Sequence, residues 1–409
     1  MIADILIKNA AELLTCHADS PKRGGDLNNP GVIENGAVAV TAGKITYVGP
    51  TKDINFEAKQ TIDAAGKVVM PGLIDCHTHA VFGGSRENDF LRKLRGERYL
   101  DILKAGGGIL STVEKTRAAS REHLLAKTLK HLDQMLAYGT TTMEIKSGYG
   151  LTFDDEQKIL EVAELANQKH PMDVVKTYLG AHTVPKDKSK SEYLREVLDS
   201  LEKMKPHAEF CDVFCEDGAF SPEESRQILT AAQNLGYKIK IHAEQMNTLG
   251  GAELAAELNA VSADHLEHIS DAGIDRLAES DTVGVLLPGV VFYLMLDKYA
   301  PARKMIDRGM ALAISTDFNP GSCPCDNLQL IMTLACLQMK MLPAEVINAA
   351  TINAAFALDR QNEIGSLHSA KQADIIILDA PNHNHVPYRF GANRVETVIK
   401  NGLIYKKNL

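Results

Sequence analysis

The chain has 409 residues, of which 45% are hydrophobic and 24% are charged, and its formal net charge is −9. These values are typical of a globular protein, and they exclude a dedicated nucleic-acid binder because no basic segment stands out. The N-terminus lacks the basic and apolar regions of a signal peptide, and no apolar run approaches the roughly 18 residues of a membrane helix. The seven cysteines are scattered and do not form the spacing of a disulfide framework. We therefore expect a cytoplasmic enzyme with one large domain, or with a barrel and a smaller companion.

The first 65 or so residues contain short runs in which apolar and polar residues alternate. These runs, Asp4–Lys8, Gly36–Val40 and Lys44–Val48, are separated by turn-forming residues. The pattern predicts small antiparallel hairpins. Between the first two runs, residues 19–31 are polar and rich in Gly, Asn and Pro, which predicts an exposed loop.

From about residue 67, apolar runs alternate with segments of helical periodicity. Ser120–Tyr138, Asp154–Gln168 and Ser221–Asn234 contain good helix formers, and Ser221 followed by Pro222 is a typical helix start. Eight alternations of strand and helix are what a closed parallel (β/α)8 barrel of the TIM type requires. The eight candidate strands are Val68–Cys76, Thr140–Ile145, Val174–Leu179, Asp212–Cys215, Lys238–His242, Ala263–His265, Val283–Leu287 and Ala311–Thr316.

Strand character returns near the C-terminus. After a helical run from Leu342 to about Leu358, the segments Ala373–Leu378 and Val395–Lys400 are rich in β-branched residues, and Asn401-Gly402 predicts a turn. The strand-rich segments at the two ends of the chain could therefore pair into one small β-domain, with the barrel inserted between them.

Polar or ionisable side chains follow nearly every candidate barrel strand at its C-terminal end, where barrels of this type carry their chemistry. His77 and His79 follow the first strand one residue apart, so their side chains point the same way. Only the seventh strand ends without such a group. The other strand ends carry Glu144–Tyr149, His182, Glu216, His242–Gln245, Asp264–His268, and Ser315–Asp317 followed by Asn319–Ser322.

His77 and His79 could chelate one metal ion if a third histidine and a carboxylate completed the ligand set. His242 is the best third ligand and Asp317 the best carboxylate. Such nitrogen and oxygen ligands suit zinc or iron, and a metal there would lower the pKa of bound water towards about 7, giving a hydroxide nucleophile. Taken alone, however, His242 could equally be a core histidine, and Asp317 could cap the turn at Asn319-Pro320.

The cysteine pairs Cys211/Cys215 and Cys323/Cys325 offer an alternative metal site. Without a second paired element nearby, these residues are more typical of small buried side chains than of thiolate ligands.

Several motifs, spread over essentially the whole chain, resemble the amidohydrolase superfamily. They are Pro71–His79, the histidines of strands five and six, Asp317, and the tail segments Gly365-Ser-Leu and Gln372-Ala-Asp-Ile-Ile. The resemblance implies a (β/α)8 barrel over residues 67–358 and a small β-sandwich made from residues 1–66 and 359–409. It also implies one divalent or trivalent metal per subunit, zinc or iron, held by His77, His79, His242 and Asp317.

Within the superfamily, five motifs resemble the members that act on an imidazolone in histidine degradation: Gly83–Arg86, Lys146–Tyr149, Leu179–His182, Ser262–His265 and Asp317–Ser322. This implies hydrolysis of the ring amide of 4-imidazolone-5-propanoate to N-formimidoyl-L-glutamate. The implied protein is a homodimer whose partner is this small anionic substrate, and it binds neither nucleic acid nor membranes. The implied substrate contacts are Arg86, Tyr149, His182, Gln245, Asn319, Gly321 and Ser322.

The side-chain chemistry agrees with these roles. A guanidinium binds a carboxylate with a planar fork, so Arg86 suits the propanoate. His182 could hydrogen-bond the ring carbonyl, and Tyr149 a ring nitrogen or the carboxylate. Asp317 and His265 are the two candidates for moving a proton to the leaving ring nitrogen.

Gln245 separates the hydrolase from its first alternative, a deaminase of heterocycles. Related deaminases carry a proton-shuttling glutamate three residues past the strand-five histidine, whereas the amide of Gln245 cannot titrate. Glu216 stands on strand four in place of a lysine that could be carboxylated to bridge two metals, which favours one metal. His268 has no assigned role and is interpreted as structural. A non-enzymatic scaffold is disfavoured because all four implied ligands are present.

Overall fold

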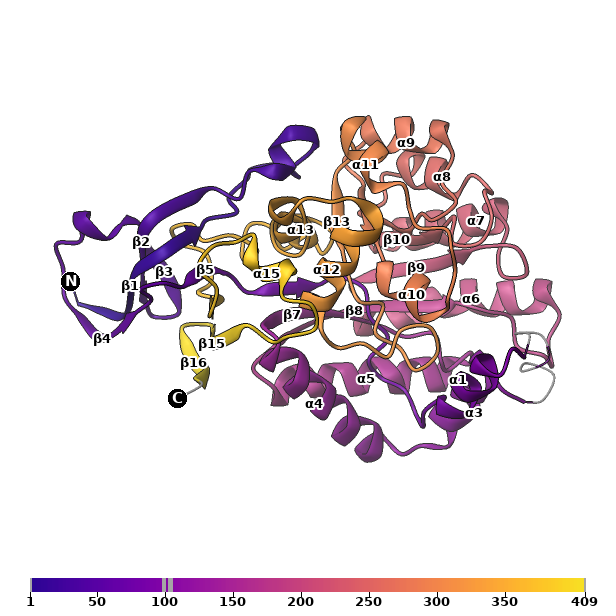
Figure 1. Ribbon diagram of the computed structural model, residues 1–409. Coiled ribbons are helices and arrows are strands. Elements are labelled where there is room, and N and C mark those ends of the chain that lie inside the picture. The colour runs from indigo at the N-terminus through magenta and orange to yellow at the C-terminus, as the bar shows by residue number, and fades with distance from the viewer. Residues whose placement is uncertain (1, 98–100, 102–105, 408–409) are drawn as a thin grey trace.

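The computed structural model describes residues 2–97, 101 and 106–407 (Figure 1). This part of the chain contains two eight-stranded sheets. One sheet consists of parallel strands in chain order, and the other combines strands from the two ends of the chain. The predicted (β/α)8 barrel with a β-domain built from both termini is therefore confirmed.

The barrel strands pair in parallel with their neighbours in the sequence. The first and last strands meet at their C-terminal ends, where Thr78 and Phe318 form a parallel bridge and the Asp317 N–H donates to the His77 carbonyl at 3.0 Å. The strands are β6 (Leu73–Asp75), β7 (Thr140–Lys146), β8 (Asp173–Ala181), β9 (Phe210–Cys215), β10 (Lys238–Ala243), β11 (Ser262–His265), β12 (Val283–Leu286) and β13 (Leu312–Ile314).

The first predicted barrel strand, Val68–Cys76, is divided at Gly72. Its first half, β5 (Val68–Pro71), pairs with strands of the terminal sheet, and only β6 belongs to the barrel. A Cβ at Gly72 would overlap the side chain of Thr141, so a glycine lets the chain pass close to β7. The barrel sheet thus begins at Leu73 and not at Val68. The domain limits predicted from the sequence, residues 67–358 for the barrel and the two terminal segments for the β-domain, remain a prediction.

The terminal sheet has the strand order β16-β15-β14-β5-β1-β2-β3, with β4 paired in parallel to β1. The strands predicted near both ends lie within it or overlap it, whereas β4 and β16 were not predicted. The strands are β1 (Ala3–Leu14), β2 (Val32–Thr41), β3 (Lys44–Pro50), β4 (Ala58–Asp63), β5, β14 (Ile375–Leu378), β15 (Val395–Lys400) and β16 (Leu403–Lys407).

Helices connect the barrel strands and surround them (Figure 1). Ser221 caps α7 (Pro222–Asn234) through a reciprocal pair of hydrogen bonds with Glu224, so the predicted helix start is confirmed. The helical run predicted from Leu342 to about Leu358 is instead divided into two helices near Thr351. No helix in the described ranges is long and apolar enough to cross a membrane. The α-helices are α1 (Glu87–Leu94), α3 (Ile109–Ala118), α4 (Arg121–Ala137), α5 (Phe153–Lys169), α6 (Lys190–Met204), α7 (Pro222–Asn234), α8 (Gly251–Glu257), α9 (Asp271–Ala278), α10 (Pro288–Tyr293), α11 (Ala302–Asp307), α12 (Leu328–Met339), α13 (Pro343–Ala349), α14 (Ile352–Phe356) and α15 (His385–Tyr388), and the short 3-10 helices are η1 (Gly24–Asn28), η2 (Thr51–Asp53) and η3 (Lys205–His207).

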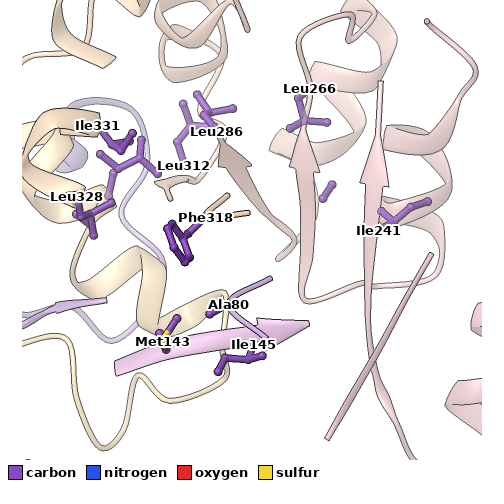
Figure 2. Packing of buried hydrophobic residues seen from close by; sticks show 14 of the residues in the cluster. Ala80, Met143, Ile145, Ile241, Leu266, Leu286, Leu312, Phe318, Leu328 and Ile331 are labelled. Atoms are coloured by element: carbon purple, nitrogen blue, oxygen red, sulfur yellow. The ribbon is translucent and has the colours of Figure 1, made fainter. Parts of the chain in front are cut away.

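The largest apolar core lies between the barrel strands and these helices. Figure 2 shows Phe318, just past the end of β13, packed among Leu312, Leu328 and Ala80. Because Ala80 and Phe318 each directly follow residues of the predicted metal site, this packing anchors two of its segments.

The prediction of an exposed loop over residues 19–31 is wrong in part. The segment contains η1, and the side chain of Leu27 is fully buried. The Lys22 N–H donates to Asn353 Oδ1 at 2.8 Å, and Arg23 forms an antiparallel bridge with Ala311. The partners of this segment lie some 300 residues further along the chain, so its local composition carried no sign of the contact.

Candidate metal centre and substrate site

The four predicted metal ligands come together at the C-terminal mouth of the barrel. His77 and His79 follow β6, His242 lies on β10, and Asp317 follows β13. One ring nitrogen from each of the three histidines lies within 4.8 Å of the other two. Asp317 Oδ1 lies 3.5 Å from Nε2 of both His77 and His79, which completes the group.

The donor atoms of this group fit a bound metal. His77 Nε2, His242 Nε2 and Asp317 Oδ1 are buried and lack hydrogen-bond partners among the residues that the structure describes. Burial lowers the pKa of His77 and of His79 well below the ordinary value, so both rings are neutral and offer a lone pair. A buried polar atom without a partner costs about 1–3 kcal/mol, which coordination would offset. Imidazole nitrogens with one carboxylate are a ligand set typical of zinc or iron.

Asp75 ties together two segments that carry ligands, a role that the sequence did not predict. Its fully buried carboxylate accepts hydrogen bonds from the Thr316 N–H at 3.0 Å and Thr316 Oγ1 at 2.7 Å, and from the Ser315 hydroxyl. Burial raises the pKa of Asp75 to about 6, against the effect of these bonds. The strand that leads to His77 is thereby joined to the strand that leads to Asp317.

His182 and Tyr149 form a wall beside His79. The ring of His182 stacks on that of His79 with centroids 5.2 Å apart, and Tyr149 lies 5.6 Å from both rings. His182 Nδ1 lies 3.0 Å from the Gly148 carbonyl, and burial lowers the pKa of His182 to about 4. A neutral His182 that donates from Nδ1 leaves Nε2 as an acceptor. In this tautomer Nε2 can accept a hydrogen bond from an N–H group but cannot donate one to a carbonyl oxygen, the contact predicted from the sequence.

Glu156 holds the loop that carries Tyr149. Its buried carboxylate accepts hydrogen bonds from the N–H groups of Gly148, Gly150 and Leu151, each at 2.7 Å. Gly148 and Leu151 both have positive φ, at 113° and 54°. A carboxylate from α5 thus stabilises a tight loop in which Leu151 adopts a backbone conformation that is unfavourable for a non-glycine residue.

Arg86 lies against the loop that follows Asp317. An ideal Cβ built on Gly321 would lie 2.7 Å from Arg86 Cζ and still closer to Nη1, so only glycine leaves room for the guanidinium. Arg86 Nε donates to Asp89 Oδ2 at 2.9 Å, and the same oxygen accepts from the Gly108 N–H at 2.8 Å. Gly321 is therefore adjacent to the predicted anion-binding side chain.

Asn319 shapes the same loop. Its Oδ1 accepts from the N–H groups of Gly321 and Ser322, both at 2.8 Å, and its Nδ2 donates to the Asp317 carbonyl and to Ser322 Oγ, both at 2.7 Å. These four bonds use both N–H donors and both oxygen lone pairs of the amide. Asn319 therefore stabilises the loop that carries the predicted substrate contacts Gly321 and Ser322.

Two glutamates hold the loop that carries Gln245 after β10. Glu216 Oε2 accepts from the Met246 N–H at 2.8 Å, and Glu244 Oε1 accepts from the N–H groups of Gly250 and Gly251 at 2.9 and 2.7 Å. Gln245 is half-buried at the start of this loop. Glu216, which the sequence placed at the mouth, thus supports a loop and does not face the ligand group.

His265 is buried beside the ligand group, with its ring centroid 5.2 Å from that of His242 and 5.5 Å from that of His77. Its Nδ1 lies 3.7 Å from Oε1 of Glu267, whose two buried oxygens have no hydrogen-bond partner among the described residues. Burial by itself would lower the pKa of His265, but the carboxylates of Glu267 and Asp317 raise it above the ordinary value. The sequence placed Glu267 within the polar segment that ends strand six but assigned it no role, although its position two residues past a strand-end histidine was a signal.

His265 and Leu266 also have positive φ values of 82° and 69°. Two consecutive non-glycine residues in this region are strained, and such strain is concentrated at functional sites. By contrast, His268 is half-buried with its Nδ1 2.9 Å from Lys298 Nζ, away from the ligand group.

The alternative cysteine site is not supported within the described ranges. Cys211, Cys215 and Cys323 are buried, and Cys325 is half-buried, all as free thiols, and the metal-binding groups found contain histidines and carboxylates only. Burial raises the pKa of Cys215 and Cys325 to about 11, which keeps both sulfurs protonated.

Comparisons with known proteins agree with this geometry. A family model described as the amidohydrolase family matches residues 68–404. Imidazolonepropionases from Bacillus cereus (strain AH187) and Bacillus thuringiensis (strain Al Hakam) are each 51% identical over 407 residues, covering 98% of this chain and 96% of their own.

Two solved structures share the fold at lower identity. An adenosine deaminase from Xanthomonas campestris with bound zinc is 21% identical with a TM-score of 0.73, covering 99% of this chain and 93% of that one. An atrazine chlorohydrolase from Arthrobacter aurescens TC1 complexed with zinc is 16% identical with a TM-score of 0.70, covering 99% and 95%. At these identities the likeness extends to the fold alone.

Proposed function

The chain belongs to the amidohydrolase family, and we propose that it has imidazolonepropionase activity, hydrolysing the ring amide of 4-imidazolone-5-propanoate to N-formimidoyl-L-glutamate. The family and the activity predicted from the sequence agree with relatives that are half identical over nearly the whole chain. One observation supports the proposal most directly. Arg86 lies against Gly321, in the loop that begins at Asp317, so an anion-binding side chain borders the metal-ligand group.

We propose that His77, His79, His242 and Asp317 hold one zinc or iron ion. The unpaired buried atoms of His77, His242 and Asp317 support this assignment. When bound, the metal would supply Lewis acidity towards the attacking water and the ring carbonyl.

Substrate orientation follows from the charges and donors at the mouth. The Arg86 fork would bind the propanoate, with Gly321 leaving room for it. His182 Nε2 would accept a hydrogen bond from a ring N–H, because its Nδ1 donates to the Gly148 carbonyl. Tyr149, Gln245 and Ser322 would complete the contacts around the ring.

We assign the proton transfer to His265, with Asp317 as a ligand. Hydrolysis adds the oxygen of one water molecule to the carbonyl carbon and breaks the bond from that carbon to the ring nitrogen. His265 would take one water proton and return it to that nitrogen, and the second proton leaves when the new carboxyl ionises. Glu267, 3.7 Å from His265 Nδ1, would orient the ring during this transfer.

The proposal is tested by adding purified protein to 4-imidazolone-5-propanoate. We expect the imidazolone absorbance to fall and N-formimidoylglutamate to form in equal amount, in proportion to the zinc or iron content measured on the same sample. The deaminase alternative predicts instead the release of ammonia from amino-substituted heterocycles. A metal-loaded protein that leaves the imidazolone unchanged would refute the proposal.

We further propose that the protein is a cytoplasmic homodimer. Helices α1 and α10 expose apolar side chains next to one another, since the ring of Phe90 stacks on that of Tyr293 at 5.3 Å. The exposed residues on and just after these helices are Phe90, Leu91, Leu94, Phe292, Met295 and Leu296. A cluster of this kind is typical of an interface. Light scattering after size exclusion tests it, and a monomer at micromolar concentration would contradict it.

A further inference from the structure

Below the metal-ligand group, the barrel interior encloses charged side chains that the proposed reaction does not use. Each is fully buried. They come from four strands, and they are Glu144 and Lys146 on β7, Asp212 on β9, Lys240 on β10 and Asp264 on β11. Burying ions is costly unless each is paired, so a barrel interior normally holds branched apolar residues here. The presence of these ions requires an explanation beyond packing.

Two of the carboxylates face metal ligands from behind. Asp264 Oδ2 lies 2.6 Å from His77 Nδ1, and Asp212 Oδ2 lies 3.1 Å from His242 Nδ1. A carboxylate behind a metal-binding histidine sets which nitrogen carries the proton and which way the ring turns. The Nε2 atoms of both rings have no hydrogen-bond partner among the described residues, and His242 Nδ1 contacts Asp212 by proximity of charge without hydrogen-bond geometry.

Lys146 joins these two carboxylates. Its Nζ lies 2.7 Å from Asp212 Oδ2 and 3.4 Å from Asp264 Oδ2, and 3.0 Å from Glu144 Oε2. Burial by itself would lower the pKa of Lys146, but the three carboxylates raise it above the ordinary value, so the ammonium is charged. A single cation therefore contacts the acceptors behind two ligands that come from opposite parts of the barrel.

Lys240 provides an internal comparison. It is as deeply buried as Lys146 and belongs to the same network, with its Nζ 3.0 Å from Glu144 Oε1 and 3.2 Å from the Cys76 carbonyl. In the described part of the chain neither partner forms a hydrogen bond or ion pair with a ligand histidine, although a Glu144 oxygen lies within 4.8 Å of a His77 nitrogen. The two lysines share deep burial and a carboxylate partner in Glu144, but only Lys146 contacts Asp212 and Asp264.

We propose that Lys146 is a positioning residue of the metal centre, holding Asp212 and Asp264 so that His242 and His77 turn their Nε2 atoms towards the metal. Without the ammonium, two carboxylates in a dry interior repel each other and turn away from the histidines. The inference rests on the proposed metal site, but it concerns metal affinity and not the identity of the substrate.

The test compares Lys146→Met and Lys146→Gln with Lys240→Met as the matched control. Circular dichroism establishes folding, and the Kd for Zn²⁺ is measured on metal-free protein by competition with a chromophoric chelator. We expect the two Lys146 variants to bind Zn²⁺ about 10- to 100-fold more weakly than the unmodified protein, the range for loss of an outer partner. Lys240→Met should lower the Tm of the metal-free protein but change the Kd by less than about threefold.

Three outcomes would overturn the proposal. A folded Lys146→Met or Lys146→Gln protein with an unchanged Kd would show that the ammonium does not position the ligands. An equal loss of affinity in Lys240→Met would make the effect a general property of the network. Failure of both Lys146 variants to fold would make the residue structural only. If the unmodified protein binds Zn²⁺ but does not hydrolyse the imidazolone, the proposed function fails while the zinc measurements still decide the role of Lys146.

Discussion

Replacing Gly321 by alanine should displace the Arg86 guanidinium without touching any metal ligand. The added Cβ would lie 1.9 Å from Arg86 Nη1 and 2.7 Å from Cζ, whereas non-bonded heavy atoms in contact are about 3.5–4.0 Å apart. The guanidinium must therefore retreat by roughly 1.5 Å. Because Arg86 Nε is held by Asp89, the retreat rotates the fork away from the position that we assign to the propanoate.

The expected loss of affinity follows from losing one of the two hydrogen bonds that the guanidinium would donate to the substrate carboxylate. A hydrogen bond to a charged group contributes about 1.5–3 kcal/mol, and each 1.4 kcal/mol is about tenfold in affinity. We expect KM to rise about 10- to 100-fold in Gly321→Ala, with a smaller change in kcat, because binding of the carboxylate is mostly uniform between ground state and transition state. Arg86→Ala should show the same pattern at the upper end of this range.

Initial rates of imidazolone loss over a range of substrate concentrations measure both constants. Gly25→Ala is the control, since a Cβ there would meet no atom within 4 Å. The double variant Arg86→Ala/Gly321→Ala should be no worse than Arg86→Ala alone, because the alanine acts only through the arginine. An unchanged KM in Gly321→Ala, or fully additive losses in the double variant, would refute the reasoning.

Three further perturbations test other parts of the site. His242→Ala should lose both bound metal and turnover, measured by elemental analysis and by the absorbance assay. Full activity in the metal-free variant would show that His242 is not a ligand of a catalytic metal. Glu156→Gln should weaken the loop that carries Tyr149, because an NH₂ group would face at least one backbone N–H donor, at a cost of about 1–3 kcal/mol. Its Tm should fall and its KM rise, and a wild-type KM would mean that the loop does not need this carboxylate. Burial lowers the pKa of His131 to about 4, so between pH 6.5 and pH 4 the unfolded chain binds a proton that the folded protein excludes, and stability is lost as the pH falls through this window. His131→Phe should therefore show a smaller fall in Tm from pH 6.5 to pH 4 than the unmodified protein, and parallel curves would contradict this.

The candidate ligands could be found from the sequence because each directly follows an apolar strand. His77, His79, His242 and Asp317 occupy strand ends, and in a parallel barrel all strand ends of one kind meet at one mouth. This argument needs only the order of strands and helices, which hydrophobic periodicity reveals locally.

The groups that support these ligands could not be found in this way. Lys146, Asp212 and Asp264 form one cluster although their positions span more than a hundred residues, and nothing local distinguishes an ion pair inside a barrel from a solvated charge. Likewise, the role of Asn319 became visible only from its four hydrogen bonds within one turn.

Local sequence thus determined the alternation of strands and helices, the strand-end histidines and the absence of a titratable group at Gln245. Only the tertiary structure decided that the strand after Lys67 is shared between two sheets at Gly72, and that residues 19–31 pack on the barrel. It also decided that two buried lysines lie beneath the ligands. The physical reason is that periodicity and capping act between neighbours in the chain. Burial and charge pairing, in contrast, depend on which distant segments the closed barrel brings within a few ångströms of each other.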